Sequence, residues 1–248
     1  MTMATPDAID KCLSFISSQF KESEQPAAPC TRRTHPLAVT ISRQSGSGAW
    51  RIAECLANYL PKVHPCDPRP WTVFDKELVE KVLEDHNLPK KLADYMPEDR
   101  VSVIDDIMNE LFGLQPSSWT LVEQTAETIL KLAELGNVIL IGRGANIVTA
   151  RLDHVFHVRL VGSIEKRLER VKARLGLDDA SAMDYIVKTD RGRQRYLKEH
   201  YKADIDNPLL YDMVINTDRI SSESAAMLIA DALLRWAFGT SFARKNLA

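Results

Sequence analysis

A glycine-containing turn near the start of the chain has the composition of an anion-binding loop. The apolar run over residues 37–41 is followed by Ser-Arg-Gln and then by Ser-Gly-Ser-Gly at residues 45–48. Gly46 and Gly48 have no Cβ, so the backbone can take positive φ and its amides can approach a bulky anion. The helix expected to begin near Ala49 adds unpaired N–H groups and the positive end of its dipole. The turn therefore predicts a phosphate-binding loop.

The turn differs from the standard phosphate loop G-x-x-x-x-G-K-[ST], in which the lysine neutralises phosphate charge and the hydroxyl holds magnesium. Ala49 stands at the lysine position and Arg51 at the Ser/Thr position. An ordinary strand-to-helix turn, made flexible by glycine and serine, would have the same composition. The loop alone leaves both interpretations open, and the rest of the chain has to separate them.

Two further apolar runs end in residues that suit phosphate chemistry. Asp75 follows the run over residues 71–74, and Gly-Arg-Gly, with Arg143 at its centre, follows the run Val138–Ile141. A planar guanidinium grips phosphate through two N–H groups, so Arg43 and Arg143 are candidates for phosphate binding. The alternatives are a structural salt bridge for Arg143 and helix capping for Asp75.

A charged helical region late in the chain supplies more cations. Within residues 179–202, Lys188, Arg191 and Arg195 share one face of the expected helix, and Arg193 lies off that face. Such a run of charge is usually a solvated face. The alternative, which the neighbouring Asp190 favours, is a lid that grips phosphate and excludes water during transfer.

Composition excludes several classes of protein. The formal net charge of the 248 residues is −2, which gives no sign of nucleic-acid binding or of attachment to an acidic membrane. No apolar run approaches membrane-spanning length. The four cysteines form no C-x-x-C pair and no zinc spacing with the six histidines, so we predict no metal-ligating residues and a cytoplasmic location.

Apolar runs and helical periodicity alternate from residue 37 onward. The expected strands cover residues 37–41, 71–74, 138–141, 154–160 and 211–216. The principal expected helices cover residues 51–60, 76–86, 118–135, 163–175, 179–202 and 222–238. This alternation predicts a parallel sheet with helices on both faces, and ligands of such folds bind at the carboxyl ends of the strands. The three strand ends described above should therefore meet in one cleft.

The first 36 residues are set apart from this pattern. Residues 5–20 begin with Thr-Pro-Asp and continue with apolar residues at helical spacing, which predicts one short amphipathic helix. Residues 22–36 are rich in proline, alanine and polar residues and are interpreted as a linker. We expect the helix to dock on the main domain, residues 37–248. A homodimer formed through this helix is the alternative.

Five segments, in this order, resemble the cytidylate kinase-like family of P-loop nucleoside monophosphate kinases: ISRQSGSG, FDKELVE, VILIGRGAN, VKTDRGRQRYLKEHY and YDMVINTDRIS. The resemblance extends from about residue 37 to residue 238. It implies a parallel sheet of five strands and transfer of the γ-phosphate of ATP, with Mg²⁺, to CMP or dCMP. It also implies an acceptor-binding helical segment over about residues 75–117 and a mobile lid over about residues 185–208.

Roles for individual residues follow from three sources together: the phosphate-binding loop at residues 45–48, the charge pattern and the family resemblance. The residues expected to bind the cofactor ATP are Arg43, Gln44, Ser45, Gly46, Ser47, Gly48 and Ala49. Those expected to bind the acceptor are Asp75, Arg143 and Lys188. Those expected to act in transfer are Arg143, Arg191 and Arg195.

Two departures from cytidylate kinases keep other functions open. Ala49 stands in place of the loop lysine, and Ile141 in place of an aspartate before Gly-Arg. Losing both groups could remove several kcal/mol of transition-state stabilisation, at about 1.4 kcal/mol per tenfold in rate. The alternatives are a non-catalytic nucleotide-binding or regulatory module and a kinase whose acceptor is not a nucleotide.

Overall fold

A computed structural model describes residues 14–15, 17–18, 36–64, 67, 69–84, 98–113 and 120–239. Most of the helix expected over residues 5–20 and of the linker over residues 22–36 lies outside the described residues. None of the helices in the described ranges is both long and apolar enough to cross a membrane.

Five parallel strands form one sheet in the order β2-β3-β1-β4-β5. The strands are β1 (Ala38–Arg43), β2 (Thr72–Phe74), β3 (Val138–Ile141), β4 (Val155–Val161) and β5 (Met213–Asn216). The helices are α2 (Ala49–Val63), α3 (Lys76–Glu84), α5 (Glu98–Phe112), α6 (Thr120–Leu135), α7 (Ala145–Val148), α8 (Ile164–Leu175), α9 (Asp179–Tyr201), the 3-10 helix η2 (Pro208–Leu210) and α10 (Ser222–Phe238). The five-stranded parallel sheet with helices on both faces is confirmed.

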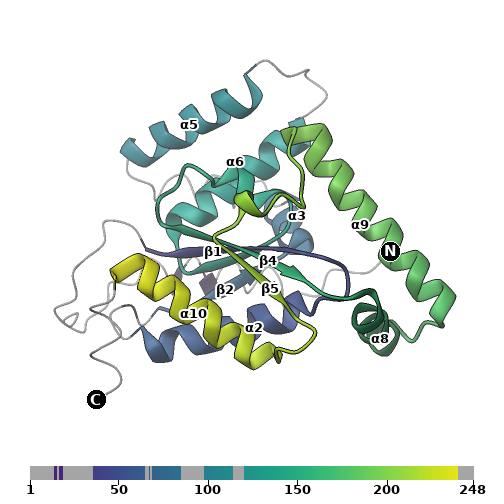
Figure 1. Cartoon of the computed structure of the whole chain (residues 1–248). Helices are drawn as coiled ribbons and strands as arrows, with labels where there is room; N and C mark the ends of the chain where they lie inside the picture. The colour runs from purple at the N-terminus through teal and green to yellow at the C-terminus, as the bar shows by residue number, and fades with distance from the viewer. Residues whose placement is uncertain are drawn as a thin grey trace.

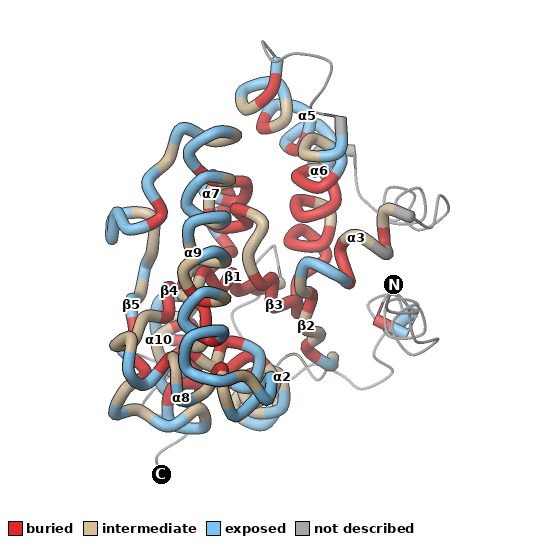
Figure 2. Tube along the Cα trace, turned by 90° about the vertical axis from the view of Figure 1, so that its right-hand side faces the viewer, coloured by how far each residue is buried: buried red, intermediate tan, exposed pale blue. Residues whose placement is uncertain are grey.

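Helices cover the two faces of the sheet (Figure 1). Helices α2 and α10 lie on one face, and α3, α6 and α7 lie on the other. Alternate residues of β1 enter opposite cores: Ala38 packs with α6, and Val39 and Ile41 pack with α2 and α10. Figure 2 shows β1, β3 and β4 buried and much of α9 exposed. The central strands are apolar because both of their faces are covered.

Short polar side chains start the helices near the site. Ser163 accepts a hydrogen bond from the Lys166 amide at the start of α8, and Asp178 accepts one from the Ser181 amide at the start of α9. Gly176, at φ 66°, ends α8. These caps bring α8 and α9 back over the carboxyl ends of β1 and β4.

Phe15, near the start of the chain, is buried against the sheet. Its ring meets the ring of Phe74 edge to face, with 5.3 Å between the centroids. Phe74 is the last residue of β2, directly before Asp75. At this point the N-terminal segment contributes to the core of its own chain.

Candidate functional site

The turn after β1 has the backbone geometry of an anion cradle. Gly46 has a φ of 79° and Gly48 a φ of 81°, values that favour glycine. Gly48 is the N-cap of α2, which begins at Ala49, and no side chain caps this end of the helix. The N–H groups of Gly46, Gly48 and Ala49 form no hydrogen bond within the described residues. Three backbone donors are therefore open to an anion.

Two arginines of α8 hold the carbonyl side of the same turn. Arg167 Nη1 donates to the Ser45 carbonyl at 3.3 Å, and Arg170 Nη1 donates to the Gly46 carbonyl at 3.4 Å. Arg167 is buried although it lies on a charged helix. These contacts fix the peptide planes of the loop and add positive charge beside it.

One carboxylate from α9 already occupies part of the cradle. Asp190 Oδ1 accepts from the Ser45 amide at 2.7 Å and from Arg193 Nη1 at 3.0 Å, and Asp190 Oδ2 accepts from Arg167 Nη1 at 2.6 Å. An oxyanion held by a loop amide and two guanidinium groups shows that this surface binds anionic oxygens.

Next to the loop, the ends of β1 and β3 and the helix α9 enclose a cavity of about 290 Å³. Its lining includes Arg43, Lys76, Arg143 and Arg193, and no carboxylate of the described residues lines it. Arg43 is the last residue of β1, and Lys76 and Arg143 come shortly after β2 and β3, so these three strand ends meet at the cavity as expected. Four cations around one small space favour an anionic ligand.

Arg143 stands in an unusual backbone. It has a φ of 55° between Gly142 at 84° and Gly144 at 71°. Its guanidinium pairs with Glu80 of α3 and lies 5.6 Å from the centroid of the Tyr196 ring. The salt bridge considered as an alternative is present, and the side chain also lines the cavity. Strained residues held in this way concentrate at ligand sites.

The environment of Arg43 is crowded with positive charge. Burial, followed by the nearby charge of Arg193, lowers the pKa of the Arg43 guanidinium to about 9. The side chain remains protonated at neutral pH, and Arg193 Nη1 donates to the Arg43 carbonyl at 3.5 Å. A bound anion would relieve the repulsion between these two cations.

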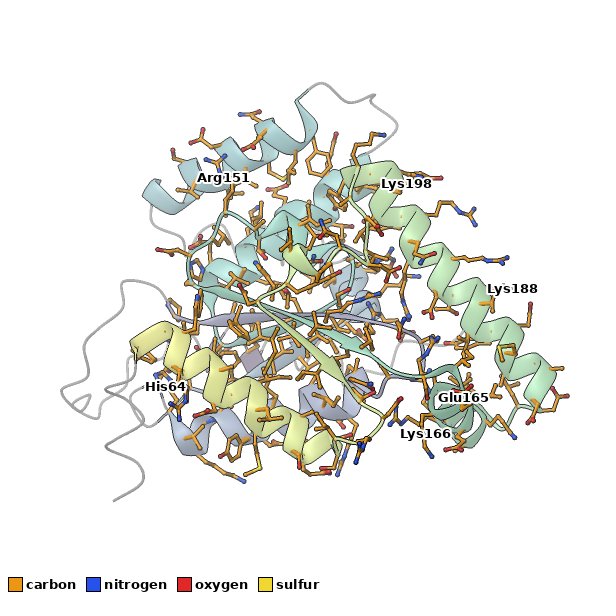
Figure 3. All side chains as sticks on the ribbon, in the orientation of Figure 1. His64, Arg151, Glu165, Lys166, Lys188 and Lys198 are labelled. Carbon is orange, nitrogen blue, oxygen red and sulfur yellow. The ribbon has the colours of Figure 1, made fainter. Side chains whose placement is uncertain are left out.

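The three predicted residues of α9 lie away from the cavity of strand ends. Arg191 and Arg195 are exposed, although Arg191 borders a second cavity of about 320 Å³ beside Arg167. Lys188 pairs with Asp184 and points away from the sheet, as Figure 3 shows. The roles assigned to these three side chains stay predictions.

The inward face of α9 is instead formed by residues at a 4-3-4 spacing. Ile186 and Leu197 are buried; between them, Asp190 contacts the Ser45 amide of the loop and Arg193 contacts the Arg43 carbonyl at the end of β1. Arg193, which the sequence placed off the cationic face, is therefore the arginine of α9 that reaches the end of β1 beside the loop. On α3, Asp75 Oδ1 accepts from the Leu78 amide at 3.0 Å, so the expected cap is present.

Three arginines at the site, Arg159, Arg167 and Arg170, were not among the predicted site residues. Arg159 is buried in β4 and donates to the Ser42 hydroxyl at 2.9 Å and to Asp206 at 2.8 Å. Arg167 occupies a position between Ile164 and Val171, where the helical repeat of α8 turns inward. An arginine within an apolar strand, or on the apolar stripe of a helix, was the available signal, because such a charge requires a partner.

Comparison with known proteins agrees with this architecture. A family model described as "Cytidylate kinase-like family" matches residues 38–219. The cytidylate kinase of Methanopyrus kandleri is 35% identical over 205 residues, which cover 79% of this chain and 93% of that protein. The cytidylate kinase of Methanocaldococcus jannaschii is 21% identical over 158 residues, which cover 63% of this chain and 89% of that protein.

A solved structure with the same fold is known. The crystal structure of an uncharacterized protein from Eubacterium ventriosum matches with a TM-score of 0.54 at 18% identity, over 79% of this chain and 98% of that chain. The sheet and its covering helices are thus an arrangement found in an independently solved protein.

Proposed function

Since this chain belongs to the cytidylate kinase-like family, we propose that it transfers the γ-phosphate of ATP to a nucleoside monophosphate, with CMP or dCMP as the acceptor. The observation that carries the proposal is the open amide cradle beside a cavity with four cations and no carboxylate among its described lining residues. Phosphoryl transfer depends on positioning and charge neutralisation, which this arrangement can supply.

In this proposal the loop binds the phosphates of ATP without a lysine. The amides of Gly46, Gly48 and Ala49 would receive phosphate oxygens, as helix N-termini do. Arg43 and Arg193 lie beside the loop and would supply the missing positive charge. A guanidinium suits this task because it stays charged and offers several donors in one plane.

Arg143 would hold the acceptor phosphate at the other side of the cavity. A monophosphate oxygen is ionised near neutral pH, so the acceptor needs no general base. We assign to Arg193 the transfer role that the family resemblance implied for Arg191 and Arg195, because Arg193 lines the cavity and those two side chains are exposed.

Magnesium would enter with the phosphates of ATP and would neutralise their charge when bound. No group of three His, Cys, Asp or Glu side chains suited to a metal ion occurs in the described ranges. Mg²⁺ needs fewer, since phosphate oxygens and water complete its coordination. The Ser47 hydroxyl of the loop is buried without a partner in the described part of the chain, so it would be available to the ion.

A second candidate is a nucleotide-binding module that does not catalyse transfer. Ala49 is the first residue of α2, and the Arg51 guanidinium pairs with Glu223 with 65% of its side chain exposed. Arg51 therefore does not replace the lysine in the loop. Tight ATP binding in calorimetry, together with no phosphate transfer, would support this candidate.

The test is a coupled ADP-release assay with ATP, Mg²⁺ and each of the common nucleoside monophosphates. We expect turnover with CMP and dCMP, and a large loss of kcat/KM in Arg143→Ala without loss of fold. Arg151→Ala is the matched control, because Arg151 pairs with Glu110 on the surface, where 58% and 62% of the two side chains are exposed. No turnover with any monophosphate would exclude the proposed function.

A further inference from the structure

Tyr196, on the helix α9, lies against the arginine that we assign to the acceptor phosphate. The guanidinium carbon of Arg143 is 5.6 Å from the centroid of the Tyr196 ring. An aromatic ring attracts a guanidinium out to a distance of about 6 Å. Both side chains line the 290 Å³ cavity at the strand ends. The ring therefore acts on Arg143 at the place where the phosphate would bind.

The ion pair of Arg143 is open to water. Arg143 Nη2 donates to a carboxylate oxygen of Glu80 on α3, and 24% and 36% of the two side chains are exposed. An ion pair that water reaches is weak and restrains its side chains poorly. The ion pair alone therefore does not fix the guanidinium at the cavity, and a second restraint is needed.

The Tyr196 ring is held in place by the last turn of α9. The Tyr201 ring meets it edge to face, with 6.0 Å between the centroids and 68° between the planes. The Tyr201 ring also covers Gly144, where an added Cβ would lie 2.6 Å from it, and it contacts Phe112 of α5 with 6.2 Å between the centroids. Gly144 directly follows Arg143 in the chain. The turn that carries the arginine thus also anchors the helix that carries the tyrosine.

An aromatic ring suits this position better than a second carboxylate would. The face of the ring attracts a cation and takes none of its N–H groups as a carboxylate oxygen would. The donors of Arg143 that Glu80 does not use therefore stay available to a phosphate. A second carboxylate would take up those donors and repel the phosphate, and an aliphatic side chain would not attract the guanidinium.

We propose that Tyr196 is a positioning residue, whose ring holds the Arg143 guanidinium toward the cavity so that it meets the acceptor phosphate. This inference rests on the proposed function, and it adds a residue that acts through Arg143 and not on the ligand. Because Tyr196 belongs to α9 and Arg143 to the turn after β3, the placement of the helix determines whether the acceptor site is ready to bind.

The first test compares Tyr196→Phe, which keeps the ring, with Tyr196→Leu, which keeps an apolar side chain without a ring. In Tyr196→Leu we expect kcat/KM for CMP to fall about 5- to 30-fold, the equivalent of one partly desolvated contact between a cation and a ring. The KM for ATP should stay within about threefold of the wild-type value, because the contact lies outside the phosphate loop. In Tyr196→Phe, kcat/KM for CMP should also stay within about threefold of the wild-type value.

The second test repeats both substitutions in Arg143→Ala, with more enzyme in the assay so that slow turnover is measured. In this background Tyr196 has no guanidinium to position, so Tyr196→Leu should change kcat/KM for CMP by less than about twofold. A ring that only packs, or that touches the ligand itself, would cost as much in Arg143→Ala as in the wild-type chain. The double-mutant cycle thus separates a positioning role from a structural one.

Tyr211→Leu is the matched control. The guanidinium carbon of Arg159 lies 5.8 Å from the centroid of the Tyr211 ring, a contact of the same kind, but Arg159 does not line the 290 Å³ cavity. The substitution should lower the melting temperature, because it also removes the hydrogen bond from the Tyr211 hydroxyl to the Ile205 carbonyl at 2.8 Å. The KM for CMP should stay within about threefold of the wild-type value.

Several outcomes would overturn the inference. These are an unchanged kcat/KM for CMP in Tyr196→Leu, an equal loss in the two backgrounds, a loss in Tyr196→Phe as large as in Tyr196→Leu, and an equal loss in Tyr211→Leu. If the wild-type chain turns over no monophosphate, the proposed function fails, and the Kd for CMP from calorimetry takes the place of kcat/KM in the same cycle. Absence of CMP binding by the wild-type chain would then overturn the inference as well.

Discussion

The two glycines of the loop allow the cradle to be tested with a matched pair of substitutions, Gly46→Ala and Gly48→Ala. Both residues have a φ near 80°, so either alanine pays the strain of the left-handed region, about 1–2 kcal/mol. Their surroundings differ. A Cβ on Gly46 would lie 2.5 Å from the backbone carbonyl oxygen of Arg167, whereas a Cβ on Gly48 would find its nearest neighbour, the Ser222 hydroxyl, at 4.0 Å.

The expected losses of unfolding free energy follow from this difference. For Gly48→Ala we expect the strain alone, about 1–2 kcal/mol. For Gly46→Ala the contact is with backbone that cannot rotate away, so α8 must shift. Overpacking of this kind adds about 1–3 kcal/mol, which gives a total of about 2–5 kcal/mol.

Urea unfolding followed by circular dichroism measures these losses, and calorimetry measures the Kd for ATP. A shift of α8 would pull Arg167 and Arg170 from the loop carbonyls, so Gly46→Ala should also weaken ATP binding by at least about tenfold, and Gly48→Ala by less. Equal losses of stability in the two variants would refute the packing of α8 on the loop. Wild-type ATP affinity in both variants would refute the phosphate cradle.

Three further outcomes are expected. Asp190→Ala should lower the unfolding free energy by about 3 kcal/mol, because it leaves the buried Arg167 without its carboxylate. The same substitution should tighten ATP binding, because it frees the Ser45 amide. Weaker ATP binding in calorimetry would contradict this. Burial lowers the pKa of His157, so the unfolded chain takes up the proton more readily, and the unfolding free energy should fall as the pH drops through about 6.5. Urea titrations from pH 8 to pH 5.5 should show a shallower fall in His157→Gln, and identical slopes would exclude the effect. Arg51→Ala should leave the Kd for ATP unchanged in the same calorimetry, and a tenfold rise would show that this exposed side chain replaces the missing lysine.

Much of the fold could be predicted from local sequence. The run Val138–Ile141 is apolar throughout and ends in glycine, and the strand has these bounds. The helix predicted over residues 222–238 follows Ser221, whose hydroxyl caps it. Gly46 and Gly48 both take the positive φ that the loop interpretation required. Apolar runs, helix caps and turn glycines each involve only a few neighbouring residues, so they can be recognised without knowledge of tertiary contacts.

The orientation of α9 could not be predicted from local sequence. Its exposed and inward faces both carry charge, and the inward face mixes Ile186 and Leu197 with Asp190 and Arg193. Periodicity in the sequence cannot show which of two charged faces points inward. Contacts with a loop almost 150 residues earlier in the chain determine the inward face of α9.

The contact between Phe15 and Phe74 bears on how the protein should be produced. A recombinant version trimmed to residues 38–219, the extent of the family match, would lose the ring that covers the end of β2 and all of α10. The hydrophobic core therefore includes residues on both sides of the range that the family model matches. Inactivity of such a shortened protein would report damaged packing, and kinetic work should begin from the full 248 residues.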